Sequence, residues 1–273
     1  MSRLTDTSAE ADRVLTEVYR RMSPGDKWLR LGHTYRDARL LHAAGVRLRN
    51  PAATRLDIHA SWLALHCGLT SPEFLKEPLM DQPLSTLNEL RAFITVLERL
   101  GIAYALGGSM ASSIHGVDRF TRDADLTVEP FPGREAELAG SFGPDYYVNL
   151  SSIEEAVRSR SSFNIIHTPT GFKIDVFVRK DEPFETSAMK RRISLSLPDK
   201  PEQPIVLHSP EDVILLKLRW YRLGNETSEQ QWKDLLGVIK TQSNRLDQQY
   251  LDKWAAHLGV HDLLARARQE SAV

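Results

Sequence analysis

The sequence has little of what secreted and membrane proteins use to reach their compartment or to stabilise themselves there. Its 273 residues contain a single cysteine, Cys67, so no internal disulfide can form, which fits a reducing compartment. No run approaches the ~18 apolar residues that cross a bilayer, and the first residues lack the apolar stretch of a secretion signal. We therefore expect a cytoplasmic protein, with Cys67 as a small buried apolar side chain.

An excess of charge of either sign is also missing. The chain has 35 Lys and Arg against 36 Asp and Glu, and its formal net charge is −1. This balance gives no general attraction to nucleic acid or to an anionic membrane, so contact with RNA would need a local basic patch. Hydrophobic residues make up 41% of the chain, which is enough to fill an ordinary globular core.

Several catalytic motifs are absent as well. The sequence has no Gly-x-x-x-x-Gly-Lys phosphate loop, no Gly-x-Gly-x-x-Gly fingerprint and no His-Glu-x-x-His zinc motif. His59 and His66 lie two helical turns apart, but no Cys or acid at a suitable spacing completes a metal site around them. These absences argue against P-loop ATPases and zinc proteases.

The hydrophobic pattern divides the chain into three parts. The first contains predicted helices at residues 8–22, 25–48 and 54–67. The proline-rich segment 68–83 follows them and marks a boundary. The second part has a helix at 85–100, shorter helical stretches near 133–142 and 151–159, and strands at 103–106, 123–128, 162–167 and 171–178. The third part is helical at 209–221, 229–240, 247–258 and 261–268.

This pattern predicts three domains. A helical N-terminal domain would occupy residues 1–80, an α/β (α+β) core residues 84–208, and a C-terminal helical bundle residues 209–273.

A turn of small residues comes after the first predicted strand. Gly107 and Gly108 allow a sharp turn and a close approach of the backbone to a ligand, and Ser109 opens the next helix. Free N–H groups and the helix dipole at that end favour phosphate oxygens, and Ser109 adds a hydroxyl donor. Such turns usually just connect two elements, so this one predicts a phosphate site only in combination with acidic residues further along the chain.

Three aspartates lie on the later predicted strands. Asp123 and Asp125 are separated by one residue, so both side chains leave the same strand face, and Asp175 can join them from a neighbouring strand. Three carboxylates ~4 Å apart would repel by about 4 kcal/mol per pair at an effective dielectric of ~20, and a divalent cation removes that conflict. Oxygen ligands suit Mg²⁺, with Mn²⁺ as a substitute. Single aspartates more often face water, but this spacing favours metal-assisted phosphoryl transfer.

Basic residues accompany the acids. Lys173 should point to the same face as Asp175, where it either balances charge near a triphosphate or is simply solvated. Arg119, Thr121 and Arg122 lie in the loop before the acidic pair, and one of the arginines is a candidate for gripping phosphate oxygens.

Other polar and aromatic residues near these motifs have plainer explanations. Basic clusters occur at residues 190–192 and 217–222, the second with Trp220 and Tyr221 interleaved. We expect both aromatic residues in the core or at its boundary. His115 lies between the glycine turn and the acids, where packing under the turn is its expected role.

The motifs in chain order resemble those of the DNA polymerase beta-like nucleotidyltransferase superfamily, and most of all bacterial relatives of abortive-infection nucleotidyltransferase toxins. The resemblance covers roughly residues 85–240. It is carried by Leu106-Gly107-Gly108-Ser109, His115-Gly116, Arg119, Thr121, Asp123-Ala124-Asp125-Leu126 and Lys173-Ile174-Asp175-Val176. One departure is Ala124, where a larger apolar residue is common, and we expect it to weaken packing slightly.

The resemblance implies a fold and a set of roles. The fold is a polymerase-beta-like core with a mixed sheet, flanked by N-terminal and C-terminal helical regions. Two Mg²⁺ ions would be held by the catalytic acids Asp123, Asp125 and Asp175, the last of which would also accept the acceptor's proton. A lysine on the first helix after the sheet often helps to bind nucleotide, and Lys217 fits that place. Candidate nucleotide-binding residues are therefore Gly107, Gly108, Ser109, Arg119, Thr121, Lys173 and Lys217.

We therefore predict a Mg²⁺-dependent nucleotidyltransferase that moves a nucleoside monophosphate from a nucleoside triphosphate such as ATP to an acceptor hydroxyl. A transfer-RNA end, a protein and a small molecule all remain open as acceptors. A role in a toxin–antitoxin pair or in phage defence comes from the resemblance alone. The alternative is a catalytically silent module of the same fold, which the three acids disfavour. The N-terminal helices could recognise the acceptor or form a dimerisation surface, but a stabilising cap on the core is the expected role. A second copy of the chain in a homodimer, or a cognate antitoxin, is a candidate partner, and no membrane contact is expected.

Overall fold

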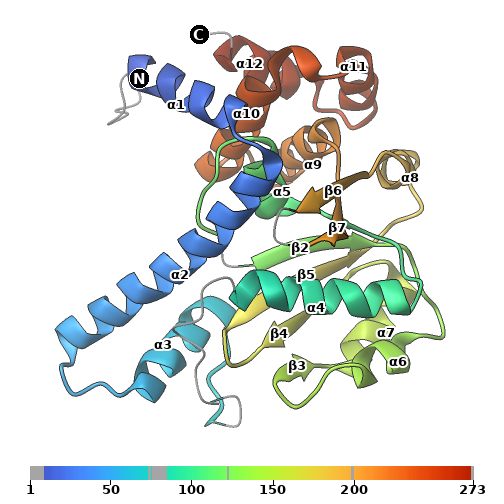
Figure 1. The fold of residues 1–273 in the computed structure, drawn as a ribbon. Coiled ribbons are helices and arrows are strands. Elements are labelled where there is room, and N and C mark those ends of the chain that lie inside the picture. Colours follow the sequence, from blue (N-terminus) through green and yellow to red (C-terminus); the bar gives the residue numbers. More distant parts are fainter. Residues whose placement is uncertain (1–8, 73–74, 76–84, 122, 198–199, 272–273) are drawn as a thin grey trace.

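The computed structural model describes residues 9–72, 75, 85–121, 123–197 and 200–271. Among the residues it describes, no helix has the length and apolar character needed to span a membrane. The mixed α/β architecture predicted from the sequence is confirmed: a seven-stranded mixed sheet is flanked by helices on both sides (Figure 1). The segment 68–83, where the first domain boundary was placed, lies mostly outside the described residues.

The first three helices form the N-terminal part of the chain, and two of them, α2 and α3, project beyond the sheet as a pair (Figure 1). They are α1 (Ala9–Arg21), α2 (Pro24–Arg49) and α3 (Arg55–Cys67). Helix α2 begins where Ser23 accepts a hydrogen bond from the Asp26 N–H, with proline in the first turn. Its first half buries Trp28 and Tyr35, and each such buried side chain contributes roughly 1.5–3 kcal/mol.

Helix α3 has matched signals at its two ends. Thr54 and Asp57 form a capping box, and Gly68 closes the helix with φ +70°, a left-handed conformation that suits glycine. Cys67, the last residue of this helix, is half-buried, and its thiol donates to the Gly171 carbonyl.

The middle of the chain alternates helices and strands. The helices are α4 (Ser85–Arg99), α5 (Gly108–His115), α6 (Glu135–Gly140), α7 (Leu150–Ser159) and α8 (Pro183–Lys190). The strands are β1 (Tyr104–Leu106), β2 (Asp123–Val128), β3 (Tyr146–Val148), β4 (Ser162–His167), β5 (Phe172–Val178), β6 (Ile193–Leu197) and β7 (Lys200–Leu207). Their order in the sheet is β3-β4-β5-β2-β1-β7-β6. Strand β2 runs parallel to β5 and antiparallel to β1.

The last part of the chain is helical, as predicted. It comprises α9 (Pro210–Leu223), α10 (Glu229–Gln242), α11 (Gln248–His257) and α12 (His261–Ser271). Helices α4 and α7 contact the strands from one side of the sheet, while α5 contacts β2 and lies against α9 and α10 on the other (Figure 1). Helix α9 begins at the predicted cap, Ser209, which accepts from the Asp212 N–H.

One hydrophobic core runs through all of these parts. It extends from Trp28 of α2 through the sheet to Ala267 of α12, and Ala124 and Leu126 of β2 lie fully buried in it. The division into domains at 1–80, 84–208 and 209–273 stays a prediction. The core shows that the three parts pack on one another.

Candidate active site

The predicted acids lie on the two central parallel strands. The register of β2 and β5 places Asp123 opposite Lys173 and Asp125 opposite Asp175. Because side chains alternate along a strand, these four residues share one face, while the intervening Ala124 and Ile174 face the core. The structure therefore brings Asp175 to the acidic pair from the neighbouring strand, as the sequence predicted.

Lys173 contacts the acids rather than open solvent. Its ammonium lies 2.6 Å from Asp175 Oδ2 and 3.8 Å from Asp123 Oδ2, and its side chain is 25% exposed. Burial acts to lower the pKa of Lys173, but its hydrogen bond to Asp175 and the nearby negative charges outweigh burial and raise that pKa. The lysine therefore stays charged and offsets part of the negative charge of the site.

The environment of Asp125 disfavours the ionised form of its carboxyl group. Burial, followed by the charges of Asp123 and Asp175, raises the pKa of Asp125 to about 7. Burial also raises the pKa of Asp175, against the opposing effect of Lys173. The negative charge here is thus only partly compensated by the chain's own residues, and an added cation would stabilise the ionised acids.

The glycine turn lies directly against Asp125. The Gly107 N–H donates to the Asp125 backbone carbonyl at 2.7 Å. Gly108 has φ +53°, and a Cβ added to it would lie 1.7 Å from Asp125 Oδ2. Only glycine fits there, since any side chain would occupy the space of the carboxylate. The N-terminal turn of α5, with its free N–H groups, consequently begins beside the acids.

A second cluster connects the turn to the C-terminal helices through Asp234 of α10. Arg119 donates to both Asp234 oxygens, at 2.8 and 2.9 Å, and also to the Ser109 hydroxyl oxygen. Lys217 of α9 donates to Asp234 Oδ2 at 2.8 Å and to Gln231 at 2.9 Å. One carboxylate therefore holds two candidate nucleotide-binding residues directly, and a third, Ser109, through Arg119.

Both members of the Lys217–Asp234 pair are buried, each with a side chain 5% exposed. Burial lowers the pKa of Lys217, and Asp234 opposes that effect. For Asp234, burial acts to raise its pKa, but Arg119 and Lys217 outweigh burial and lower it. The carboxylate is consequently held ionised between two cations, a geometry that fixes the direction of both basic side chains.

Sequence reasoning did not identify Asp234. The residue lies 115 positions from Arg119 and 17 from Lys217, in a helix whose other polar residues are exposed or half-buried except for Thr241. A charged residue among the apolar positions of α10 could have pointed to Asp234, because a buried carboxylate needs a basic partner.

The remaining predicted residues have structural partners. The Thr121 hydroxyl donates to the Asp123 backbone carbonyl at 3.2 Å and approaches its Oδ1 at 3.3 Å, so it steadies that acid. Arg122 lies outside the described residues. His115 is buried under the turn, with Nε2 2.8 Å from the His208 carbonyl, which confirms the packing role expected for it.

The two predicted basic clusters differ from simple phosphate patches. Arg191 forms an ion pair with Glu211, and Arg192 donates to the Tyr104 carbonyl. In the second cluster Tyr221 is buried, as expected. Trp220 is not in the core: its side chain is 53% exposed.

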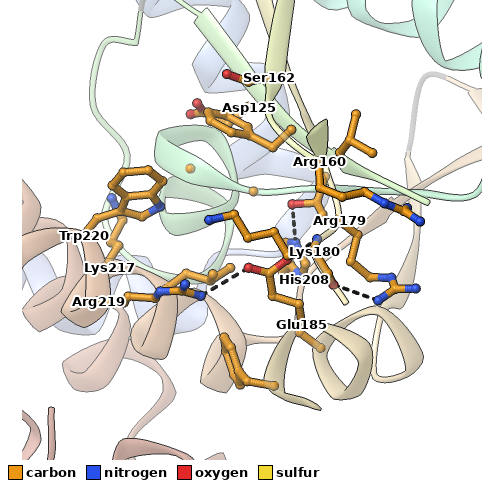
Figure 2. Close-up of a pocket in the computed structure, with 18 of the residues that line it drawn as sticks. Asp125, Arg160, Ser162, Arg179, Lys180, Glu185, His208, Lys217, Arg219 and Trp220 are labelled. Carbon is orange, nitrogen blue, oxygen red and sulfur yellow. Dashed lines mark hydrogen bonds and ion pairs between the residues drawn. The ribbon is translucent and has the colours of Figure 1, made fainter. Parts of the chain in front are cut away.

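A cavity of about 580 Å³ opens beside the glycine turn (Figure 2). Asp125 and Ser162 lie at one end of it, Lys217 and Trp220 on one wall, and Arg160 and Arg179 on the opposite wall. Its volume is in the range of small-molecule sites. Its lining also includes Gly107, Gly108, Thr127, Phe177, Lys180, Phe184, Glu185, His208, Leu216, Arg219 and Leu223.

The donors expected for a metal are chemically suitable, since carboxylate oxygens are the ligands that Mg²⁺ prefers. As placed, however, the Lys173 ammonium contacts both Asp123 and Asp175. Within the described ranges, no group of three or more His, Cys, Asp or Glu residues is arranged to hold a metal ion. Because burial and the neighbouring carboxylates raise the pKa of Asp125, a cation placed beside it would stabilise its ionised form. The Mg²⁺ site stays a prediction, favoured by the donors and their charge.

Comparison with known proteins gives only distant structural likeness. No protein-family model matches the chain, and no curated protein sequence matches it. Among solved structures, the chain is similar to an antigenic nucleotidyltransferase-like protein from Paracoccidioides brasiliensis, with a TM-score of 0.40 and 20% identity over 66% of this chain and 92% of that chain. At this TM-score we draw no conclusion about the fold or the activity from the likeness.

Proposed function

We propose that the protein is a Mg²⁺-dependent nucleotidyltransferase that transfers a nucleoside monophosphate from a nucleoside triphosphate to an acceptor hydroxyl. The observation that carries this proposal is the register of the two central strands. It places Asp125 opposite Asp175 and Asp123 opposite Lys173, directly against a glycine turn that begins a helix. Acids, a lysine and a helix N-terminus at one point are the groups that such a transfer requires.

The chain's own residues divide the work. The N–H groups at the start of α5 and the Ser109 hydroxyl would bind phosphate oxygens, with Lys217 on the cavity wall as a further cation. Asp123, Asp125 and Asp175 would hold Mg²⁺, which when bound polarises phosphoryl oxygens and neutralises developing charge. Asp175, whose pKa is raised by burial, would accept the proton of the attacking hydroxyl. The products are the nucleotidylated acceptor and pyrophosphate.

Asp234 would act as a positioning residue in this scheme. It contacts Arg119 and Lys217 directly, and it reaches Ser109 through Arg119. Because these basic side chains are already fixed before a ligand binds, little ordering is left to occur on binding.

The proposed reaction does not by itself select the acceptor or the biological role. A transfer-RNA end, a protein hydroxyl and a small molecule all carry the hydroxyl group that the proposed reaction needs. A part in a toxin–antitoxin pair or in phage defence, with an antitoxin or a second copy as partner, is supported only by the resemblance of the sequence motifs.

The direct test is incubation with labelled nucleoside triphosphates, Mg²⁺ and cell extract. Label on the α-phosphate should enter an acceptor, whereas label on the γ-phosphate should leave as pyrophosphate. Asp123→Asn should lower incorporation by at least about 100-fold, because metal binding contributes several kcal/mol to the transition state. Asp37→Asn, at an exposed position on α2, is the matched control and should leave incorporation unchanged.

Two results would contradict the proposal. Incorporation of the γ-label would indicate a kinase. Nucleotide binding without incorporation into any acceptor would instead support the silent binding module, because the fold would then hold nucleotide without turning it over.

A further inference from the structure

Trp220 differs from every other tryptophan of the chain. The sequence has five, and the other four are at most 7% exposed, whereas Trp220 is 53% exposed. A tryptophan buries a large apolar area when it packs, so an indole left half in solvent is free to receive a partner. It lies on the wall of the 580 Å³ cavity, next to the proposed phosphate site.

The position of Trp220 on α9 connects it to that site. It follows Lys217 by three residues, so the two side chains occupy neighbouring places on one helix face and both line the cavity (Figure 2). Phe177 of β5, two residues after Asp175 on the same strand face, lies with its ring centroid 6.3 Å from the indole. Lys217 thus lies beside the two rings, which form an aromatic part of the cavity lining.

The charges around the indole favour a neutral occupant. Arg219, the neighbouring cation, is bound to Glu182 at 3.2 Å and to Glu185 at 3.1 Å. On the opposite wall Arg179 is bound to Glu129 at 2.8 Å. Arg160 and Lys180 line the cavity as well, and Phe184, Leu216 and Leu223 give it apolar surface. A flat, uncharged ring system fits the surface of Trp220 and Phe177 better than a second phosphate group does.

We propose that the nucleobase of the bound nucleoside triphosphate stacks on Trp220, which Phe177 supports from the side. The inference rests on the proposed function and adds the part of the ligand that the acids and the glycine turn do not hold. Every base has a π-face, so stacking on Trp220 would add affinity for the nucleotide with little selectivity for one base. Purines, with their larger area, should bind more tightly than pyrimidines.

The test compares ATP with inorganic tripolyphosphate, which has the phosphates and no base, in the full chain with Mg²⁺. Trp220→Ala should weaken ATP binding about 5- to 150-fold, the range expected for loss of one base–aromatic stack. The same variant should bind tripolyphosphate as the wild type does. Trp220→Phe should restore most of the ATP affinity. Leu48→Ala, at a position 87% exposed on α2, is the control and should change neither affinity.

Fluorescence gives an independent readout. Since Trp220 is the exposed indole, acrylamide should quench it preferentially, and ATP should protect it while tripolyphosphate should not. Unchanged ATP affinity in Trp220→Ala, or an equal loss for both ligands, would overturn the stacking of the base on Trp220. A raised KM for the acceptor with unchanged ATP affinity would also overturn it, because the acceptor would then occupy the indole. A wild-type protein that binds neither ligand would refute the proposed function itself.

Discussion

Replacing Gly108 with alanine tests the contact between the glycine turn and the acids. Gly108 has φ +53°, and the added Cβ would lie 1.7 Å from Oδ2, 2.5 Å from Cγ and 2.7 Å from Cβ of Asp125. The left-handed backbone alone costs an alanine about 1–2 kcal/mol. Displacing the buried carboxylate adds an overpacking cost of about 1–3 kcal/mol. The expected loss in the free energy of unfolding is therefore about 2–5 kcal/mol.

Gly259 provides the matched control. Its φ is +67°, and nothing lies within 4 Å of an added Cβ, so alanine there meets backbone strain without a clash. Gly259→Ala should lose only about 1–2 kcal/mol and keep full nucleotide binding. Gly108→Ala should lose Mg²⁺-dependent nucleotide binding as well as stability, because Asp125 can no longer occupy its place.

Urea unfolding of single and double variants measures the loss in the free energy of unfolding caused by each substitution. In an Asp125→Gly background the three atoms that Gly108→Ala would meet are gone. The additional cost of Gly108→Ala should then fall to that of Gly259→Ala. If Gly108→Ala costs no more than Gly259→Ala in the wild-type background, or if its cost is the same with and without the Asp125 side chain, the described contact is wrong.

Two further predictions concern buried charges away from the acids. Asp234→Asn leaves the buried Lys217 ammonium without a carboxylate and should lower the free energy of unfolding by about 3–5 kcal/mol. Asp262→Asn, on an exposed ion pair, should leave the stability nearly unchanged, and equal losses would contradict the role of Asp234. Burial lowers the pKa of His115 and of His208 to about 4, so the unfolded chain binds protons more readily between that value and the ordinary 6.5. Stability present above pH 6.5 should be lost as the pH falls, by about 1 kcal/mol per histidine at pH 5.5, and a urea midpoint equal at pH 8 and 5.5 would refute this.

Much of the fold could be predicted because local signals and tertiary packing agree. Strands β2 and β4 have the predicted bounds. Buried and half-buried residues alternate along β2, and β4 alternates over its first four residues before it ends in three buried ones. The caps at Thr54 and Ser209 likewise begin the predicted helices. Strands β6 and β7 were not predicted, because they pair mainly with each other at the edge of the sheet and expose most of their residues. The prolines of β7 also argue against a strand on local grounds.

The sequence predicted site residues only where their positions follow from the alternation of side chains along a strand. Asp123 and Asp125 share a face by alternation, and their strand register with Lys173 and Asp175 confirms the predicted convergence. Asp234 and the exposed indole of Trp220 depend on how α9 and α10 pack against the turn, which no local pattern specifies. Tertiary packing decides which polar residues of these amphipathic helices are buried.

The most direct measurement of the central claim is a crystal structure with Mn²⁺ and a non-hydrolysable nucleoside triphosphate, read by anomalous scattering. The account predicts manganese at about 2.1 Å from carboxylate oxygens of Asp123 and Asp125. It also predicts that the Lys173 ammonium has left Asp175, and that the phosphates lie against the start of α5. Nucleotide bound elsewhere, or bound there while the acids hold no metal and Lys173 keeps its contact with Asp175, would contradict it.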